Sequence, residues 1–446
     1  MSLSALGLHT DLYELRMAET CLRTGMVADA TFSLFVRPDA QRPWFVAAGI
    51  ERALEVIEGF TYSSAELTYL REQGLSDELL GWLAGLEPAG EVWAVDEGTL
   101  LLGDEPLREV TAPLPQAMLL ETAVMNVVHL STLLATKAAR YVLAADGAGL
   151  ADFGFRRAHG LEAGIEAARA AYIGGVDSTS NVEAGRRFGI PVSGTMAHSF
   201  IQAVGDEAAA FADFAYDHPE NTILLVDTYD TLEGVRRAIA VGHDLRARGA
   251  DLVGIRLDSG DLDSLARSAR SLLDEAGFEQ TRIVASGGLD EHRVAALVGA
   301  GAPIDAYGIG TALVTSSDRP SIDIVYKLVT YDGTPRAKYS VAKATLPGRK
   351  QIHRFDDPAD DVLALRDEGG VGGRSLLRPV WRDGRRLLDF DLGRARAAVA
   401  AGLASLPAAW RGLGPVETPP RPHISPELGR CAERLRATDL ASGPVG

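Results

Sequence analysis

Short apolar runs alternate with amphipathic stretches between about residue 150 and residue 311. The runs are LADFGFR, AAYIGG, IPVSG, TILLVD, LVGIRLD, RIVASGG and AYGIGT, and most are followed by a stretch of helical length. Alternating strands and helices at this spacing predict a parallel sheet, either open or closed into a barrel. Seven recognisable strands favour the barrel.

The flanking segments follow another pattern. Residues 1–117 mix helices with β-like pieces such as ATFSLFVR and EVWAVDEGTLLL, and residues 326–395 return to β-like pieces such as RAKYSVAKATL. We therefore expect an α/β protein with a barrel over residues 118–325 and a second α/β domain that both flanking segments complete. Residues 396–446 are predicted to form a tail with a Pro-rich strip and a short helix.

Polar residues and glycines follow most of the predicted strands. Because loops at the carboxyl ends of parallel strands gather at one face, these positions are expected to line a single mouth. They are Arg156, Arg157, Asp177, Ser193, His198, Asp227, Arg256, Asp258, Ser286, Gly287, Gly288, Gly308, Gly310 and Thr311.

The charge balance restricts the class of partner. With 44 Lys and Arg against 61 Asp and Glu, the formal net charge is −17. This argues against a general nucleic-acid binder, and any phosphate site must be a local basic cluster. The 46% apolar and 24% charged composition is typical of a globular protein.

Two cysteines, Cys21 and Cys431, stand far apart and outside any zinc-like spacing. They predict neither a disulfide framework nor a structural zinc site. The N-terminus lacks a signal-peptide pattern and no window resembles a membrane span, so we expect a cytoplasmic protein without membrane contact.

Two motifs carry candidate chemistry, each with two interpretations. His198, in GTMAHSF after a predicted strand, is either a structural loop histidine or a nucleophilic or phosphate-handling imidazole. Arg256 and Asp258, in GIRLDSGDL, share a strand face and form either a structural salt bridge or part of a cradle for ribose, phosphate or Mg²⁺.

Two glycine-rich turns, SGGLDE and GIGT, follow the last two predicted strands, where barrels often bind phosphate. Glycine lets backbone N–H groups approach an anion. Arg156 and Arg157 follow Phe153 and Phe155, and are either a surface pair or the flank of a flat anionic ring. The residues do not decide which of the two arginines faces the pocket.

The chain has only five lysines, and Lys327, Lys338, Lys343 and Lys350 fall within 24 residues. This cluster is either placed for a phosphate or an interface, or lies on a solvated β edge.

Nine segments in chain order resemble nicotinate phosphoribosyltransferases. They are TDLYELRMAETCLRTG, ETAVMNVVHLSTLLATKAAR, DFGFRRAHG, GGVDSTSNVEAGRRFGIPVSGTMAHSF, LLVDTYDT, GIRLDSGDL, SGGLDE, YGIGTALVTSSDRPSIDIVYKLV and PRAKYSVAKATLPGRKQIHR. Each segment alone is weakly specific. Nine in order, with GTMAHS and RLDSGD both intact, are highly specific and extend from about residue 10 to residue 354.

The resemblance implies a type II phosphoribosyltransferase with an irregular α/β barrel and an α/β domain built from both chain ends. Such an enzyme makes nicotinate mononucleotide and pyrophosphate from nicotinate and phosphoribosyl pyrophosphate in NAD salvage. The reaction is coupled to ATP hydrolysis through a phosphohistidine. The resemblance also implies Mg²⁺, ATP as a co-substrate, and a homodimer with shared active sites.

The same resemblance implies roles for individual residues. The catalytic group would be His198 as the phosphohistidine, Arg256 and Asp258. The nicotinate site would comprise Tyr13, Phe155, Arg157, Thr195 and Arg256. The phosphoribosyl and phosphate site would comprise Arg140, Asp227, Gly287, Gly288, Gly310 and Thr311. Asp258 is the candidate Mg²⁺ ligand, and Tyr13 is expected to serve the partner subunit's pocket.

The residues suit this chemistry. Nicotinate is a planar anion, for which a stacking aromatic ring and a bidentate arginine are expected. Displacement at the anomeric carbon passes through an oxocarbenium-like state that positioned charges stabilise.

Three alternatives remain open. Nicotinamide phosphoribosyltransferase shares the DFG and DSG motifs and the histidine. In that family the DFG aspartate, which corresponds to Asp152, receives the amide of the substrate. The segments RRAHG and GTMAHS instead favour the family that uses nicotinate. Quinolinate phosphoribosyltransferase lacks these motifs and does not use ATP. A non-catalytic barrel that senses phosphoribosyl pyrophosphate would bind ligand without turnover.

Overall fold

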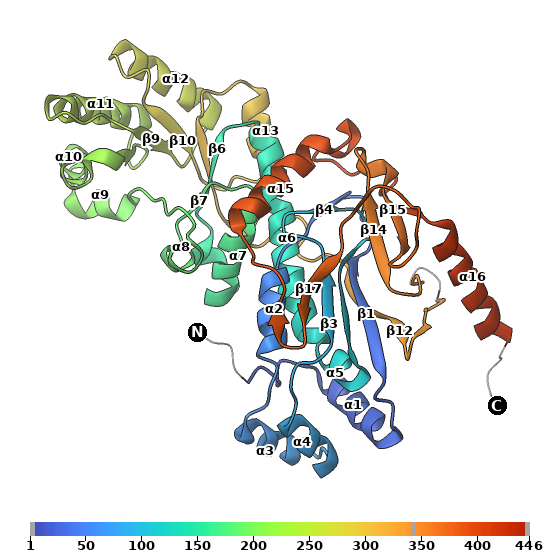
Figure 1. Ribbon diagram of the computed structural model, residues 1–446. Helices are drawn as coiled ribbons and strands as arrows, with labels where there is room; N and C mark the ends of the chain where they lie inside the picture. The colour runs from blue at the N-terminus through green and yellow to red at the C-terminus, as the bar shows by residue number, and fades with distance from the viewer. Residues whose placement is uncertain (1–4, 341–343, 442–446) are drawn as a thin grey trace. The chain divides into compact units, whose positions relative to one another are not determined.

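The computed structural model describes residues 5–340 and 344–441 (Figure 1). The chain divides into two compact units, which we call the central unit, Lys137–Pro320, and the two-segment unit, Met1–Thr136 with Ser321–Gly446. The expected α/β class is confirmed, with one unit assembled from both ends of the chain.

A seven-stranded antiparallel sheet forms the centre of the two-segment unit. Its strands in spatial order are β13 (Thr334–Pro335), β12 (Ile324–Tyr331), β1 (Asp29–Val36), β5 (Pro106–Pro113), β3 (Glu91–Ala94), β17 (Arg378–Arg382) and β18 (Arg385–Arg386). On β1, every residue after Asp29 is buried because both faces of the sheet are covered. Helix α5 (Leu114–Leu119) packs against β1 and β5, and a smaller sheet contacts β5.

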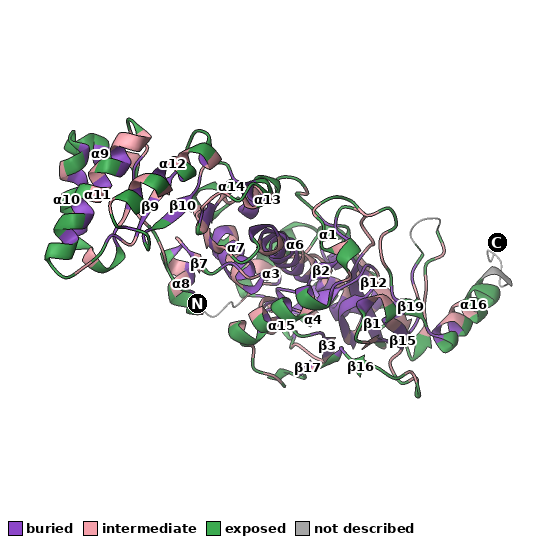
Figure 2. Cartoon of the chain, turned by 90° about the horizontal axis from the view of Figure 1, so that it is seen from above, coloured by how far each residue is buried: buried purple, intermediate pink, exposed green. Residues whose placement is uncertain are grey.

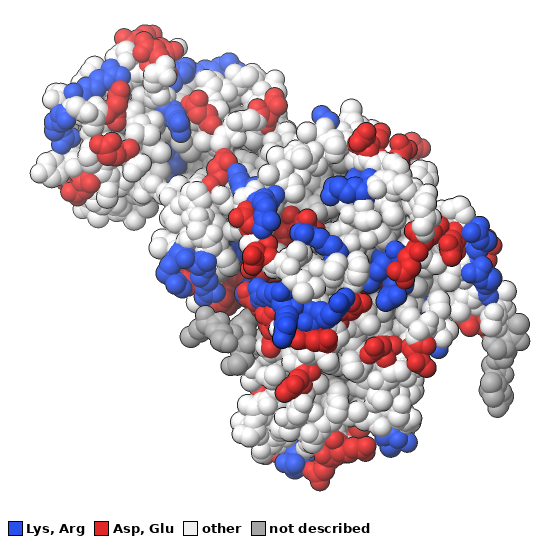
Figure 3. All heavy atoms as spheres, viewed as in Figure 1, with Lys and Arg blue, Asp and Glu red and all other residues white. Residues whose placement is uncertain are grey.

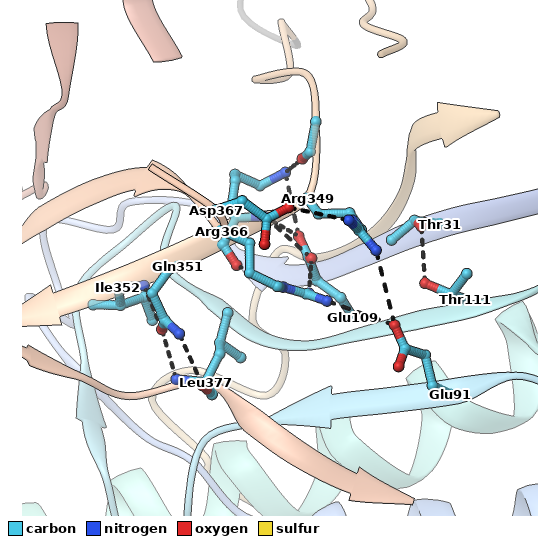
Figure 4. A network of polar contacts seen from close by, with 12 residues as sticks. Thr31, Glu91, Glu109, Thr111, Arg349, Gln351, Ile352, Arg366, Asp367 and Leu377 are labelled. Atoms are coloured by element: carbon cyan, nitrogen blue, oxygen red, sulfur yellow. Dashed lines mark hydrogen bonds and ion pairs between the residues drawn. The ribbon is translucent and has the colours of Figure 1, made fainter. Parts of the chain in front are cut away.

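The smaller sheet has four strands, in the order β16 (Arg374–Ser375), β14 (Lys350–Arg354), β15 (Val362–Leu365) and β19 (His423–Ile424). A buried ionic network joins it to the larger sheet (Figure 4). Glu109 on β5 accepts a hydrogen bond from Arg366, and its Oε1 lies 3.4 Å from Lys350 Nζ. Burial lowers the pKa of Lys350 and that of Arg366, while Glu109 opposes both shifts.

Helices complete the two-segment unit, together with a short pair of strands, β2 (Phe45–Val46) and β4 (Leu100–Leu101). The helices, besides α5, are α1 (Leu12–Thr24), α2 (Ile50–Glu58), α3 (Ser64–Glu72), α4 (Asp77–Ala84), α6 (Glu121–Ala145), α15 (Leu392–Ser405) and α16 (Pro426–Ala441). The 25-residue α6 continues into the central unit, and its residues 131–141 are all buried (Figure 2).

The central unit contains a curled six-stranded parallel sheet that forms about half of a barrel. The strands in spatial order are β7 (Ser178–Thr179), β6 (Gly149–Asp152), β11 (Ala306–Ile309), β10 (Arg282–Ala285), β9 (Gly254–Leu257) and β8 (Ile223–Leu225). The first strand in the chain, β6, pairs with the last, β11, as in a barrel. Among the described strands β7 and β8 are the edges, so the barrel is incomplete between them.

Two of the seven predicted strands are wrong. AAYIGG contributes to the last turn of helix α7 (Leu161–Ile173), which ends at Gly174, because a short apolar run suits a buried helix as well as a strand. IPVSG forms only an isolated parallel bridge from Val192 to Thr179.

The remaining helices of the central unit connect its strands. They are α8 (Val182–Phe188), α9 (His198–Val204), α10 (Glu207–Asp217), α11 (Thr231–Ala247), α12 (Leu262–Glu275), α13 (Glu291–Gly299) and α14 (Thr311–Val314). Local sequence fixes their starts: the side chains of Asp230, Asp261 and Asp290 cap α11, α12 and α13.

On the face shown in Figure 3, Lys and Arg side chains are interspersed with Asp and Glu rather than gathered into one continuous basic surface. Exposed arginines of β17 and β18 pair with acids: Arg378 with Asp96, and Arg386 with Glu58. Within residues 5–340 and 344–441, no helix has the length and apolar content needed to cross a membrane.

Candidate active site

A cavity of about 680 Å³ opens at the carboxyl ends of the parallel strands of the central unit. Its walls come from the segments that follow β6, β9, β10 and β11 and from the segment after the Val192 bridge. The lining residues are Phe153, Phe155, Arg156, Arg157, Ser180, Gly194, Thr195, Met196, Ala197, Arg256, Asp258, Ser286, Gly287, Gly288, Leu289, Asp290, Gly308, Gly310, Thr311, Ala312 and Ser317. The structure thus brings together thirteen of the residues singled out in the sequence motifs: Phe153, Phe155, Arg156, Arg157, Thr195, Arg256, Asp258, Ser286, Gly287, Gly288, Gly308, Gly310 and Thr311.

Arg256 lies near the end of β9 and donates a hydrogen bond of 2.6 Å from Nη1 to Thr195 Oγ1. Its Nε is buried and has no hydrogen-bond partner within the described part of the chain. Burial lowers the pKa of Arg256, and the carboxylates of Asp258 and Asp227 oppose that shift. A buried guanidinium with an unused donor can bind a carboxylate.

Two carboxylates are tied into one network at the ends of β8 and β9. Asp227 Oδ2 accepts hydrogen bonds from Asp258 N at 3.1 Å and from Ser259 Oγ at 2.6 Å. Asp258 Oδ1 accepts one from Ser286 Oγ at 2.5 Å, which connects the network to the glycine turn after β10. Asp227 is not a lining residue, but it orients the loop that carries Asp258 into the cavity.

His198 begins α9 and stands beside both carboxylates. Its Nε2 lies 3.9 Å from Asp227 Oδ1 and 4.0 Å from Asp258 Oδ2, and Nδ1 lies 3.0 Å from Thr228 Oγ1. The imidazole is 38% exposed, so a nucleotide phosphate could reach it. His198 therefore adjoins the cavity through Asp258 without lining it.

Neither glycine turn has room for a side chain where it packs against neighbouring residues. Gly287 has φ +90°, and a Cβ there would lie 1.8 Å from the carbonyl oxygen of Asp258. At Gly308 a Cβ would lie 2.6 Å from the Phe153 ring. Both turns therefore bring bare backbone to the cavity wall, as a phosphate cradle requires.

Arg156 and Arg157 both line the cavity. The sequence left open which of them faces the pocket because a strand would send them to opposite sides. Residues Phe155–Arg157 instead form a 3₁₀ turn, in which neighbouring side chains need not alternate between faces.

Asp177 and Ser193 of the expected mouth are not among the lining residues, and two residues to which the resemblance assigns roles lie elsewhere. Arg140 is buried, and its Nε lies 3.3 Å from Glu291 Oε1 rather than among the lining residues. Tyr13 lies on α1 in the two-segment unit and is 48% exposed. Partial burial and the nearby Glu121 and Glu14 raise the pKa of the Tyr13 phenol.

Asp152, the residue that would receive an amide, is buried and faces inward. Its Oδ1 accepts a hydrogen bond from Gly154 N at 2.8 Å and its Oδ2 accepts one from Thr179 Oγ1 at 2.8 Å. Both carboxylate oxygens are thus engaged in holding the strand ends.

Sequence reasoning missed Ser180 and Ser317 in the lining and Thr228 beside His198. All three lie in segments that carry the resemblance: Thr228 in LLVDTYDT, Ser180 in GGVDSTSNVEAGRRFGIPVSGTMAHSF and Ser317 in YGIGTALVTSSDRPSIDIVYKLV. Lys350 of the predicted lysine cluster is buried, Lys338 is exposed, and Lys343 lies outside the described residues. No group of three or more His, Cys, Asp or Glu side chains suited to a metal ion occurs in the described ranges.

Comparison with known proteins matches nearly the whole chain. Residues 8–129 match the nicotinate phosphoribosyltransferase N-terminal domain, and residues 148–363 match the nicotinate phosphoribosyltransferase family. A nicotinate phosphoribosyltransferase of Mycobacterium tuberculosis is 44% identical over 447 residues, covering 99% of this chain and 96% of the relative. One from Bacillus subtilis is 44% identical, covering 82% of this chain and 77% of the relative.

The fold agrees with these matches. The crystal structure of human nicotinic acid phosphoribosyltransferase superposes with a TM-score of 0.83 at 29% identity, covering 96% of this chain and 99% of the human chain. The chain therefore belongs to the nicotinate phosphoribosyltransferase family.

Proposed function

We propose that this protein forms nicotinate mononucleotide and pyrophosphate from nicotinate and phosphoribosyl pyrophosphate. The observation that carries the proposal is the placement of Arg256, with its unpartnered Nε, in the same cavity as the two glycine turns. A planar carboxylate on Arg256 and a sugar phosphate at the turns can then react within one cavity of about 680 Å³.

Recognition of nicotinate is assigned to Arg256, Thr195, Arg157 and an aromatic face from Phe155. The Arg256 guanidinium supplies charge-assisted hydrogen bonds to the carboxylate, and Thr195 holds the guanidinium in place. Asp152 supports the acid over the amide, because both of its oxygens already accept internal hydrogen bonds. An amide would also leave the Arg256 charge without an anion.

In the transfer step, the pyridine nitrogen forms a bond to the anomeric carbon while the bond from that carbon to the pyrophosphate oxygen breaks. Positive charge develops on the ribose, beside the carboxylate of Asp258. Gly287, Gly288, Gly310 and Thr311 would hold the donor's 5-phosphate. When bound, Mg²⁺ supplies positive charge to the leaving pyrophosphate, and Asp258, which lines the cavity, is the carboxylate that would hold it.

ATP coupling is assigned to His198. Its Nδ1 lies within hydrogen-bond distance of Thr228 Oγ1, and its Nε2 lies beside the carboxylates of Asp227 and Asp258. Transfer of the ATP γ-phosphoryl group to the imidazole would release ADP and place about −1.5 to −2 charges at the site. That charge would reorganise nearby arginine and loop contacts and tighten binding of the sugar donor.

We further propose a homodimer in which Tyr13 serves the partner subunit's pocket. An exposed tyrosine on the two-segment unit, not among the lining residues of the cavity in its own chain, suits this role. A cytoplasmic location stays a prediction from the sequence.

Product analysis by mass spectrometry tests the proposal. Purified protein receives Mg²⁺ and phosphoribosyl pyrophosphate with nicotinate, nicotinamide or quinolinate, each with and without ATP. We expect nicotinate mononucleotide formation that ATP stimulates, with ADP released. Product from nicotinamide alone would move the assignment to the amide-using relative, and ligand binding without any product would favour the sensing barrel.

A further inference from the structure

Lys137 is one of only five lysines in the chain, and its side chain is fully buried. It lies in the buried stretch of α6. A buried ammonium is unfavourable unless anions surround it, so its partners indicate what holds it in place.

The partners of Lys137 adjoin two different loops: Glu291 begins helix α13, directly after the loop Gly287–Asp290, and Asp318 lies in the loop after α14. Its Nζ donates hydrogen bonds to Glu291 Oε2 and, at 2.6 Å, to Asp318 Oδ1. Arg140, one turn further along α6, places Nε 3.3 Å from Glu291 Oε1. Glu291 and the more exposed Asp318 balance the two cations, which accounts for the burial of Lys137 and Arg140.

Both loops line the cavity. Glu291 directly follows the segment Gly287–Asp290, and Asp318 directly follows Ser317 in the segment that begins at Thr311. Tyr141, also on α6, donates a hydrogen bond of 3.0 Å to the carbonyl oxygen of Leu289, in the first of these loops. One face of α6 therefore contacts the glycine turn after β10 and, beyond α14, the segment that follows the second glycine turn.

We propose that Lys137 is a positioning residue for the sugar donor, acting through Glu291 and Asp318 to set the distance between the two phosphate-facing loops. The proposal rests on the proposed function for the identity of the donor. Lys137 does not line the cavity, so it would touch neither the base nor the donor.

A purely structural ion pair would change stability alone. A positioning role predicts a higher KM for phosphoribosyl pyrophosphate with little change in the KM for nicotinate, because Arg256 and Thr195 do not belong to either loop.

The test uses Asp318→Asn, which loosens one loop while Lys137 keeps its pairing with Glu291. The Asp318 side chain is 34% exposed, so the variant is expected to fold. Asp274→Asn is the matched control: Asp274 on α12 accepts a hydrogen bond of 2.7 Å from Arg270 and lies outside the cavity lining. Lys137→Met is the stronger variant, used if it folds.

We expect Asp318→Asn to raise the KM for phosphoribosyl pyrophosphate about tenfold, as the loss of one charged hydrogen bond would. The KM for nicotinate and all constants of the control should stay within about twofold. Unchanged donor KM in Asp318→Asn would overturn the inference.

A second readout is independent of turnover. Inorganic pyrophosphate should raise the thermal unfolding midpoint of the wild type and of Asp274→Asn. The rise should be smaller in Asp318→Asn. If the wild type makes no nicotinate mononucleotide yet shows this difference, the proposed function fails and the role of Lys137 stands. Equal protection of all three proteins would count against Lys137.

Discussion

Arg256 and Thr195, 61 residues apart in the chain, are joined by a hydrogen bond of 2.6 Å from Nη1 to Oγ1. The bond connects the end of β9 to the segment after the Val192 bridge. It fixes the guanidinium at the cavity wall, with Nε buried and without a hydrogen-bond partner among the described residues.

Replacing Arg256 with lysine should lower kcat/KM for nicotinate about 10- to 100-fold, since charge-assisted hydrogen bonds contribute about 1.5–3 kcal/mol. Thr195→Val should give a smaller loss in the same constant. Steady-state kinetics with varied nicotinate measures both. Arg282→Lys, at the exposed start of β10, serves as control, and an equal loss there would contradict the assignment.

His198→Asn should abolish the stimulation by ATP and the release of ADP, because the amide cannot accept a phosphoryl group. Slow transfer without ATP should persist, since Arg256 and the glycine turns remain. The check is the ratio of ADP to nicotinate mononucleotide. His218→Asn, an exposed histidine at the end of α10, should behave as the wild type, and an His198→Asn enzyme that ATP still stimulates would refute the phosphohistidine.

Gly287→Ala should destroy donor binding, because its Cβ would meet backbone 1.8 Å away. Gly301→Ala is the matched control: Gly301 also has positive φ, +66°, but nothing lies within 4 Å of its Cβ. The control should lose only about 1–2 kcal/mol of stability and keep its kinetics. Calorimetry measures binding of phosphoribosyl pyrophosphate, and thermal unfolding measured in parallel reports the loss of stability. If both variants bound the donor equally well, Gly287 would not be needed for the approach of backbone to the phosphate.

Tyr13→Ala and His198→Asn should each be inactive in the ATP-stimulated reaction but complement one another. In a homodimer with shared sites, random mixing of the two variants gives hybrid dimers with one intact site, so about a quarter of wild-type activity should return. The assay follows activity after subunit exchange, beside each variant alone. Mixtures that stay inactive would place Tyr13 in its own subunit's site or outside the site.

Stability should fall as pH rises between about 4.5 and about 8. Burial raises the pKa of Glu105 from 4.5 to about 8, while Arg354 opposes this shift and Asp361 adds to it. In this window Glu105 of the folded protein keeps a proton that the unfolded chain has lost. The contribution of Glu105 to the free energy of unfolding is therefore most favourable below pH 4.5 and decreases until about pH 8. Each unit of pKa difference corresponds to about 1.4 kcal/mol.

Glu105→Gln mimics the protonated acid and should flatten this dependence. The measurement is the thermal unfolding midpoint of the wild type and the variant at pH 5 and pH 8. A difference between the two proteins that does not change with pH would show that Glu105 is ionised across the range.

Much of the site followed from local sequence. Strand ends marked by glycine or a polar residue placed Arg256, Asp258, Gly287 and Gly310 at one mouth, since the direction of parallel strands decides where their ends lie. The flanking segments were also correctly expected to form one unit.

Other features needed the spatial order of elements. The contact of His198 with Asp227 depends on where α9 sits beside β8, which no local pattern encodes. The lysine pattern predicts either a phosphate site or interface, or a solvated β edge, yet Lys350 is buried beside Glu109, 241 residues away. Arg140 lies in a motif of the family, but it pairs with Glu291 and is not among the residues that line the cavity.

The seven-stranded sheet places Arg382 of β17 opposite Glu91 of β3, 291 residues earlier. During synthesis β12, β1, β5 and β3 can pair once residue 331 is made, but the β3 edge stays unpaired until more than 380 residues have left the ribosome. The central unit, whose strands are contiguous in the chain, can be complete by then. Truncation near residue 375 should therefore leave a chain whose later-formed unit aggregates while its catalytic cavity is already built.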